Sequence, residues 1–176
     1  GMLLFTLFNS SDVFLLLLLK QRGFSDQQAI GVYIFYNLVY AIFSYPMGRL
    51  GDALGMRRTF IGGLFVFSLV YAGAALTTDF TTYLVLFIFY GIYAAMTEGI
   101  SKAWISNLCK AEDTATAIGT LTAFSSIATL IASLIAAIVW QLTTPSTTFF
   151  VAASGGVLSL LYFLFVPAPI SSESAQ

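Results

Sequence analysis

Two acidic side chains stand within long apolar stretches of the sequence, where a carboxylate can bind and release a proton. Asp12 lies inside the stretch 2–19, and Glu98 lies near the end of the stretch 80–101. An ionisable group in the middle of a bilayer costs several kcal/mol, so both residues are candidates for a functional site. For Asp12 two hypotheses remain: a protonation or substrate site that lines a central cavity, or a hydrogen-bonded contact between helices.

Glu98 has a basic residue one helical turn away. Lys102 follows it at i+4, which is the favoured order for an ion pair on a helix. The spacing is compatible with a local ion pair, shared with Arg57 or Arg58. It is also compatible with a gating switch whose ion pairs break during a conformational change.

Neutral polar side chains accompany the two acids and are candidates for lining a substrate cavity. They are Asn9, three residues before Asp12, then Tyr33, Asn37 and Tyr40 on one helical face, and Tyr90, Tyr93 and Thr97 before Glu98. The alternative for these residues is packing between helices. Asn37 is predicted to be buried at mid-span, where its amide needs a hydrogen-bonding partner.

The composition excludes most water-soluble functions. Of 176 residues, 59% are hydrophobic and 9% are charged, whereas an ordinary soluble domain is about 25% charged. The net charge of −1 offers no basic surplus for nucleic acid. There is no His, and the single Cys109 excludes an internal disulfide and a multi-thiolate metal site. We therefore expect a polytopic membrane protein that is not an enzyme and needs no metal or cofactor.

Stretches of about 20 apolar residues, the length that crosses a bilayer as a helix, predict the domain organisation. We expect an all-α membrane protein, with a six-helix transmembrane bundle over residues 1–167 and a disordered polar tail over 168–176. The six predicted spans are 2–19, 29–48, 59–78, 80–101, 115–140 and 147–166.

The distribution of charge predicts orientation and internal symmetry. With both termini cytoplasmic, the inner loops hold five basic residues and the outer loops two, in agreement with the positive-inside rule. Spans one and four contain the acids, whereas spans three and six contain no charge and carry the glycine pairs 62–63 and 155–156. This pattern favours two inverted three-helix repeats, with the glycines allowing close helix contacts.

The segment between spans two and three, residues 45–58, resembles the signature loop of the major facilitator superfamily, G-x-L-x-D-[RK]-x-G-R-[RK]. Matching positions hold Gly48, Leu50, Asp52, Gly55 and Arg57, while Ala53 and Met56 replace basic residues. Gly48 and Gly55 are expected to permit a tight turn. Asp52 is expected to accept hydrogen bonds from the N-terminus of a neighbouring helix, and Arg57 and Arg58 to hold the loop on the cytoplasmic side.

The stretches 9–12 and 97–103 are similar to the seventh and tenth helices of bacterial members, so the resemblance is to a C-terminal six-helix half. It implies a secondary active transporter that moves a small molecule by alternating access in the inner (plasma) membrane of a bacterium. The implied partners are the lipid bilayer, a small-molecule substrate, and either an N-terminal six-helix half or a second copy of the chain. Nucleic acid is not among them.

The source of energy follows from what the sequence contains and lacks. No G-x-x-x-x-G-K-[ST] motif occurs, so ATP is not the direct energy source. Asp12 is the leading candidate for proton coupling and Glu98 the second. The cavity candidates favour neutral or cationic substrates, and the direction of transport, uptake or efflux, stays open. The alternative function is a non-transporting membrane scaffold or a half-size homodimerising membrane protein.

Overall fold

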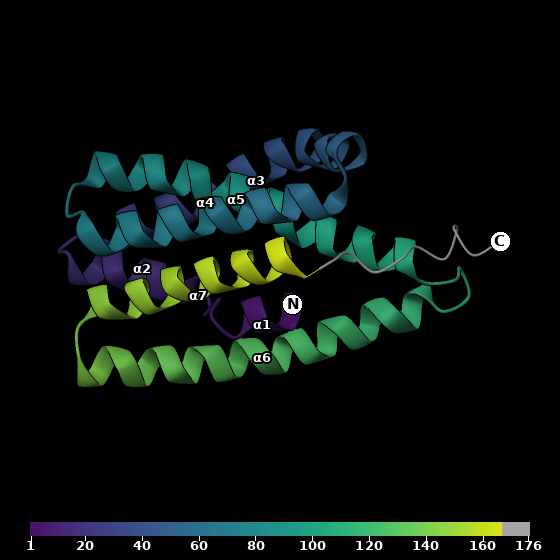
Figure 1. The fold of residues 1–176 in the computed structure, drawn as a ribbon. Helices are drawn as coiled ribbons and strands as arrows, with labels where there is room; N and C mark the ends of the chain where they lie inside the picture. Colours follow the sequence, from purple (N-terminus) through teal and green to yellow (C-terminus); the bar gives the residue numbers. More distant parts are fainter. Residues whose placement is uncertain (167–176) are drawn as a thin grey trace.

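The computed structural model describes residues 1–166, and these residues form helices joined by short connections (Figure 1). In chain order the helices are α1 (Met2–Thr6), α2 (Val13–Gln21), α3 (Asp26–Leu54), α4 (Met56–Leu76), α5 (Phe80–Leu108), α6 (Thr114–Leu142) and α7 (Pro145–Phe165). The all-α class predicted from the sequence is confirmed. The tail 168–176, which we predict to be disordered, lies outside the described residues.

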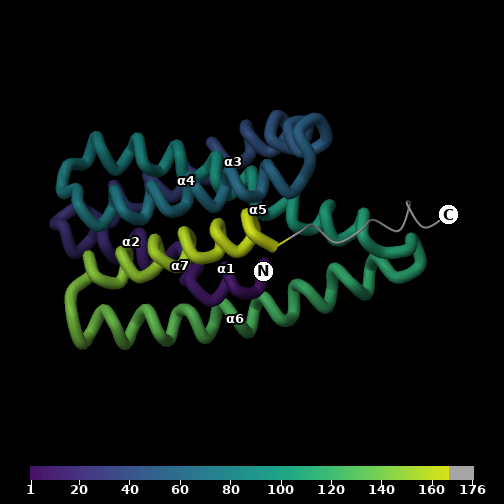
Figure 2. Tube along the Cα trace, in the orientation of Figure 1, coloured from purple at the N-terminus to yellow at the C-terminus, as the bar shows by residue number. Residues whose placement is uncertain are grey.

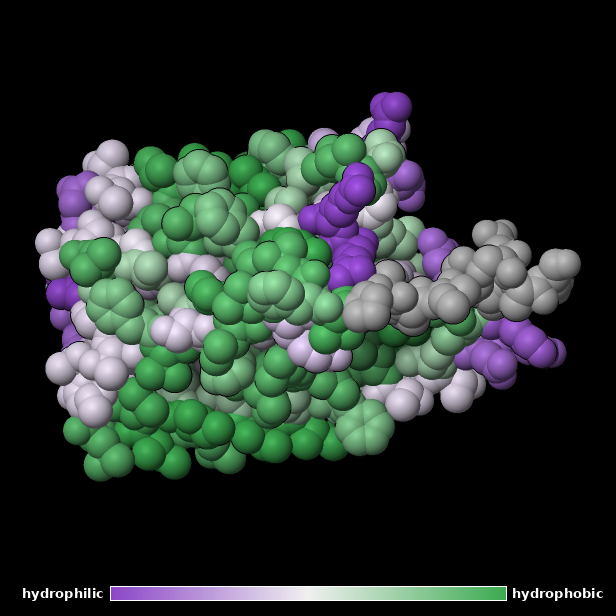
Figure 3. Space-filling model, viewed as in Figure 1, coloured by the Kyte–Doolittle hydropathy of each residue, from purple (hydrophilic) through white to green (hydrophobic). Residues whose placement is uncertain are grey.

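Five of these helices, α3 to α7, are long and apolar enough to cross a bilayer, with 21 to 29 residues each. A 21-residue α-helix is about 30 Å long, which matches the hydrocarbon core of a bilayer. Figure 3 shows the corresponding surface, on which an apolar band lies between two ends that carry polar residues. This is the surface of an integral membrane protein.

The predicted first span is not a continuous helix, so five uninterrupted spans are present in the described residues and not six. α1 and α2 have only five and nine residues, and a run of four polar residues, 9–12, stands between them. Short polar side chains hydrogen-bond the local backbone and compete with the helix. The Ser11 hydroxyl accepts from the Val13 N–H at 3.4 Å, and the Ser11 N–H donates to Ser133 Oγ of α6 at 3.2 Å. The prediction of one helical span over 2–19 is therefore wrong in its middle.

The starts of the long helices follow local capping signals. Ser25 and Gln28 form a capping box at the start of α3, each side chain accepting from the other residue's N–H, at 3.2 Å and 2.9 Å. Before α5, Asp79 Oδ2 accepts a hydrogen bond from the Thr82 N–H at 2.9 Å. This bond holds the pKa of Asp79 below its ordinary value. Thr144 caps α7 in the same way. These caps fix where the spans begin.

The core lies where α4 packs against α5 and α7, with α3 on a further side of α5. Leu64 and Phe67 of α4 are completely buried there. A Cβ at Gly63 would lie 2.6 Å from the Thr97 methyl group of α5, and one at Gly156 of α7 would lie 2.7 Å from the Phe67 ring. The two glycine pairs therefore stand at close helix contacts, because a side chain at Gly63 or Gly156 would collide with the neighbouring helix.

α6 is attached more loosely than the other long helices. Its buried residues are three alanines spaced one turn apart, Ala128, Ala132 and Ala136, whereas large side chains such as Leu130 and Leu134 are exposed. Figure 2 shows α6 along one edge of the bundle, beside α1 and α7. The outer face of α6 therefore needs lipid or another protein surface to cover it.

The segment that resembles the signature loop is mostly helical. α3 continues over Pro46 to Leu54, and Gly55 alone separates it from α4. Gly55 has φ +92° and ψ 138°, a backbone conformation that glycine adopts and other residues avoid. The tight turn predicted at Gly48 is absent, because Gly48 lies within α3.

We expect Gly55→Ala to destabilise the protein, and Gly48→Ala to leave it equally stable or slightly more stable. A Cβ at Gly55 would strain a backbone with φ +92°, at a cost of about 1–3 kcal/mol. Gly48 is helical, and a Cβ there meets nothing within 4 Å. Thermal unfolding of the purified variants in detergent measures the difference. Equal melting temperatures for the two variants would contradict this role of Gly55.

Candidate functional site

Asp12 stands at the break in the first span, immediately before α2, and its carboxylate contacts two tyrosines. Tyr90 of α5 donates to Asp12 Oδ1 at 2.5 Å, and Tyr36 of α3 donates to Asp12 Oδ2 at 3.3 Å. Hydrogen bonds to an ionised acceptor are stronger than those between neutral groups. The break, α3 and α5 therefore meet at one carboxylate.

The tyrosines near Asp12 form a buried cluster, which we call the tyrosine cluster: Tyr36, Tyr71, Tyr90 and Tyr93. The ring centroids of Tyr36 and Tyr90 are 5.0 Å apart, those of Tyr90 and Tyr93 5.3 Å, and those of Tyr71 and Tyr90 6.1 Å. All four side chains are at most 5% exposed. Asp12 is thus held by neutral hydroxyl groups rather than by a cation.

Asn9 connects the same break to the tyrosine cluster. Its Nδ2 donates to the Tyr93 hydroxyl at 3.0 Å. The Asn9 Oδ1 atom and the Tyr71 hydroxyl are buried and have no hydrogen-bond partner among the described residues. Buried polar atoms are nearly always paired. The site therefore keeps hydrogen-bonding capacity that the described part of the chain does not use.

A polar cleft runs between α1, α5 and α6, and we call it the Glu98 cleft. It consists of two adjoining cavities of about 130 Å³ and about 450 Å³. Four residues line both cavities: Glu98, Ser101, Leu121 and Ser125. Three polar residues that the sequence singles out line the smaller one: Asn9, Tyr93 and Thr97. The cleft therefore brings together candidates from spans one and four, whereas Asp12 lines neither cavity.

The predicted cavity residues of α3 do not line the Glu98 cleft. Tyr33 and Asn37 are exposed, and Asn37 Nδ2 donates to the Tyr33 carbonyl of its own helix at 2.8 Å. The prediction that Asn37 is buried is therefore wrong within this chain. Tyr40 is half-buried and lies near the Glu98 carboxylate.

Sequence reasoning misses Tyr36 and Tyr71. Tyr36 belongs to the buried stripe of α3 with Val32 and Val39, at helical spacing, so a signal was present. The sequence instead favours the neighbouring face of α3 as the functional one, because that face carries Asn37. Tyr71 has no acidic or amide residue in its own span, so only the folded structure reveals that it packs against Tyr90.

The charged residues near the α3–α4 turn make one clear contact. Arg57, at the start of α4, donates to the carbonyls of Phe163 and Val166 at the end of α7. The last carbonyls of a helix lack partners within it and attract a cation. Asp52 and Arg58 are exposed, and the described residues contain no hydrogen bond from a helix N-terminus to Asp52, contrary to the expectation.

The ion pair predicted for Glu98 with Lys102, or with the arginines of the turn, is also absent. Within residues 1–166 the ion pair present is that of Lys20 with Asp26, at 3.0 Å on the surface. Glu98 is therefore left without a cationic partner in the described chain.

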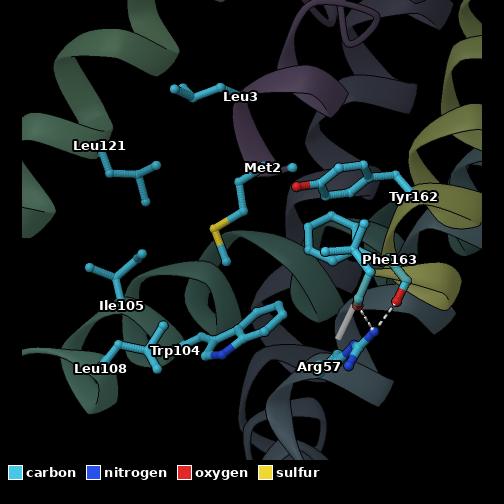
Figure 4. Close-up of a pocket in the computed structure, with 11 residues that line it drawn as sticks. Met2, Leu3, Arg57, Trp104, Ile105, Leu108, Leu121, Tyr162 and Phe163 are labelled. Carbon is cyan, nitrogen blue, oxygen red and sulfur yellow. Dashed lines mark hydrogen bonds between the residues drawn. The ribbon is translucent and has the colours of Figure 1, made fainter. Parts of the chain in front are cut away.

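A separate apolar pocket of about 320 Å³ lies beside Arg57, among the ends of α1, α5, α6 and α7. Figure 4 shows Trp104 and Met2 on its walls and Arg57 at one side, with its bonds to the end of α7. The pocket contains none of the acids. It therefore suits an apolar group and takes no part in the arrangement around Asp12 or Glu98.

Comparison with known proteins gives the family. The whole chain, residues 1–176, matches the family profile described as Major Facilitator Superfamily. An uncharacterized MFS-type transporter of Methanocaldococcus jannaschii is 35% identical over 137 residues, which cover 78% of this chain and 34% of the relative. The chain thus spans about a third of that relative's length. Because the family match extends over every helix that builds the site, the chain belongs to the Major Facilitator Superfamily.

Proposed function

We propose that the chain is part of a secondary active transporter, which moves a small molecule by alternating access and is coupled to protons through Asp12. The family and the MFS-type relative support a transporter rather than an enzyme. One observation carries the proposal of coupling. The Asp12 carboxylate lies at a helix break within the membrane region and is held by hydroxyl groups from two other helices.

The surroundings of Asp12 suit a group that changes its protonation state. A tyrosine hydroxyl donates to an ionised carboxylate and accepts from a protonated one, so the partners need not change. The groups that face Asp12 are Tyr36 of α3 and Tyr90 of α5, with Tyr71 of α4 against Tyr90, and none is charged. Since a charge in the bilayer costs several kcal/mol, protonation shifts the balance between conformations that bury Asp12 to different degrees.

The break between α1 and α2 is the element that we propose to move. Discontinuous helices near the middle of the membrane are a common device in transporters. The bond from the Ser11 N–H to Ser133 ties this break to α6, the helix whose buried residues are three alanines. A displacement of α6 would therefore change the geometry at Asp12.

We propose that the gate lies at the opposite end of the bundle from the α6–α7 connection, where α3 meets α4. Its residues are those of the signature segment and the nearby lysine of α5: Gly48, Asp52, Gly55, Arg57, Arg58 and Lys102. The contact of Arg57 with the end of α7 supports this assignment. A hydrogen bond between two helix ends can break and re-form as a half rearranges.

The proposal includes a second six-helix unit, either an N-terminal half or a second copy of the chain, in the inner membrane of a bacterium. Polar residues such as Tyr33, Asn37 and Glu98 are exposed on this chain, as are apolar ones such as Leu38 and Leu134. Lipid alone does not satisfy such polar groups within the bilayer. A partner unit would cover this mixed surface and enclose the Glu98 cleft.

Asp12→Asn is expected to abolish pH-driven uptake into vesicles, because an amide cannot bind and release the proton. Its size and hydrogen-bonding partners stay nearly the same, so folding should be preserved. Asp26→Asn is the matched control, because Asp26 lies on the surface in an ion pair with Lys20. Uptake is measured in proteoliposomes with and without a pH gradient. Unchanged coupling in Asp12→Asn would rule out this carrier.

Tyr90→Phe is expected to lower coupled transport about tenfold or more, since a hydrogen bond to a charged group is worth about 1.5–3 kcal/mol. Tyr36→Phe should have a smaller effect, because its bond to Asp12 is longer, 3.3 Å against 2.5 Å. Tyr83→Phe is the control: this buried tyrosine donates to the carbonyls of Ala74 and Thr77 and not to Asp12. Transport rates over a range of pH give the comparison. An equal loss in all three variants would indicate a packing effect only.

A further inference from the structure

The Glu98 cleft is open to a ligand, in contrast to the tyrosine cluster. Its larger cavity, about 450 Å³, lies along α5 and α6, and the smaller one, about 130 Å³, extends inward to Asn9 and Tyr93. Glu98 lines both cavities and is exposed. A molecule that enters the larger cavity therefore meets this carboxylate before it reaches the break in the first span.

The cleft holds a carboxylate, Glu98, that forms no ion pair within residues 1–166. Among the described residues that line the smaller cavity, Glu98 is the one Asp, Glu, Lys or Arg. Lys102 lines the larger cavity but forms no ion pair with Glu98 within residues 1–166. A carboxylate on a membrane-spanning helix without a counter-ion is costly. A cationic ligand would supply the missing partner.

The hydrogen-bonding groups of the cleft are mostly acceptors. Four hydroxyl groups along it donate to backbone carbonyls of their own helices at 2.8 to 3.0 Å: those of Thr97, Ser101, Thr122 and Ser126. A hydroxyl whose proton is used in this way still offers lone pairs. This arrangement suits a ligand that brings hydrogen-bond donors, as an ammonium group does.

An aromatic wall faces the polar side of the smaller cavity. Phe5, Phe60 and Tyr93 all line it, and the Phe5 ring lies edge-on to the other two at centroid distances of 6.3 Å and 6.1 Å. Aromatic rings bury the apolar part of a ligand and attract a cation to their faces. The cleft therefore offers both parts of a site for an amine with an apolar body.

We propose that the Glu98 cleft binds a small organic cation, with a protonated primary or secondary amine facing Glu98 and an apolar body against Phe5 and Phe60. The inference rests on the proposed transport function for its biological meaning, since it names the class of substrate. It also gives the two acids different roles. Glu98 pairs with the ligand, and Asp12 carries the proton.

Binding is tested with three probes of similar shape and different charge: benzylammonium, benzyl alcohol and benzoate. Calorimetry on the complete gene product in lipid nanodiscs, without any pH gradient, gives the three dissociation constants. We expect the cation to bind most tightly. Glu98→Gln should weaken benzylammonium about tenfold or more, the effect of losing a charged hydrogen bond, and leave benzyl alcohol unchanged. Glu112→Gln, at an exposed position between α5 and α6, is the matched control.

The results separate this inference from the proposed function. Tight binding of benzoate, no preference for benzylammonium, or an unchanged preference in Glu98→Gln would overturn the inference. Because no gradient is applied, a protein that binds the cation but shows no pH-driven uptake would contradict the transport proposal and leave this inference standing. Unchanged binding of benzyl alcohol shows that Glu98→Gln is folded.

A second measurement does not depend on the choice of probe. With Cys109→Ser removing the native thiol, Ser125→Cys places one cysteine in both cavities. A trimethylammonium methanethiosulfonate should react faster than a sulfonate reagent of the same length, and Glu98→Gln should remove most of the difference. The same ratio of rates with and without Glu98 would overturn the inference.

Discussion

The polar run between α1 and α2 places backbone and side-chain groups where lipid cannot hydrogen-bond them, and the neighbouring helices supply the partners. Tyr36 of α3 and Tyr90 of α5 bond Asp12, Tyr93 bonds Asn9, and Ser133 of α6 bonds the Ser11 N–H. The break between α1 and α2 is therefore bonded to three long helices, α3, α5 and α6, and the faces that carry these bonds turn inward. The tyrosines on those faces are large enough to fill the core as well as to reach the carboxylate.

The same constraint explains why the two membrane acids have such different surroundings. Asp12 receives two hydroxyl donors within the bundle, so its carboxylate is stabilised without a cation and closed off from the cavities of the cleft. Glu98 stands on α5, where the neighbouring hydroxyl groups of Thr97 and Ser101 donate to backbone carbonyls of the same helix. No residue of the described chain forms an ion pair with it. The first environment suits a proton, and the second suits a larger cation.

The sequence reveals the all-α membrane class and the five long helices, because apolar stretches between charges are a strong signal. It also singles out Asn9, Asp12, Tyr90 and Tyr93, which the structure brings together. The buried stripe of Val32, Tyr36 and Val39 on α3 is visible in the sequence, but Tyr33 and Asn37 form a competing polar face, and packing against α5 distinguishes the two. The helical continuation of α3 to Leu54 is hidden because Pro46, Gly48 and Gly51 are typical of a loop, whereas the helix continues over all three.

The helices differ in how freely they can move. α4 and α7 approach each other at Gly156, where a Cβ would lie 2.7 Å from the Phe67 ring, and Arg57 joins the start of α4 to the end of α7. Interfaces of this closeness resist sliding, because any shift brings atoms into collision. α6 instead has three alanines as its buried residues, packs Trp140 against Phe14 and Phe149, and is bonded once to the break. A conformational change that keeps the core intact would therefore displace α6 and the break against a rigid α4–α7 pair. Since α6 forms one wall of the Glu98 cleft and Ser133 holds the segment that carries Asp12, such a displacement would couple the opening of the cleft to the environment of Asp12.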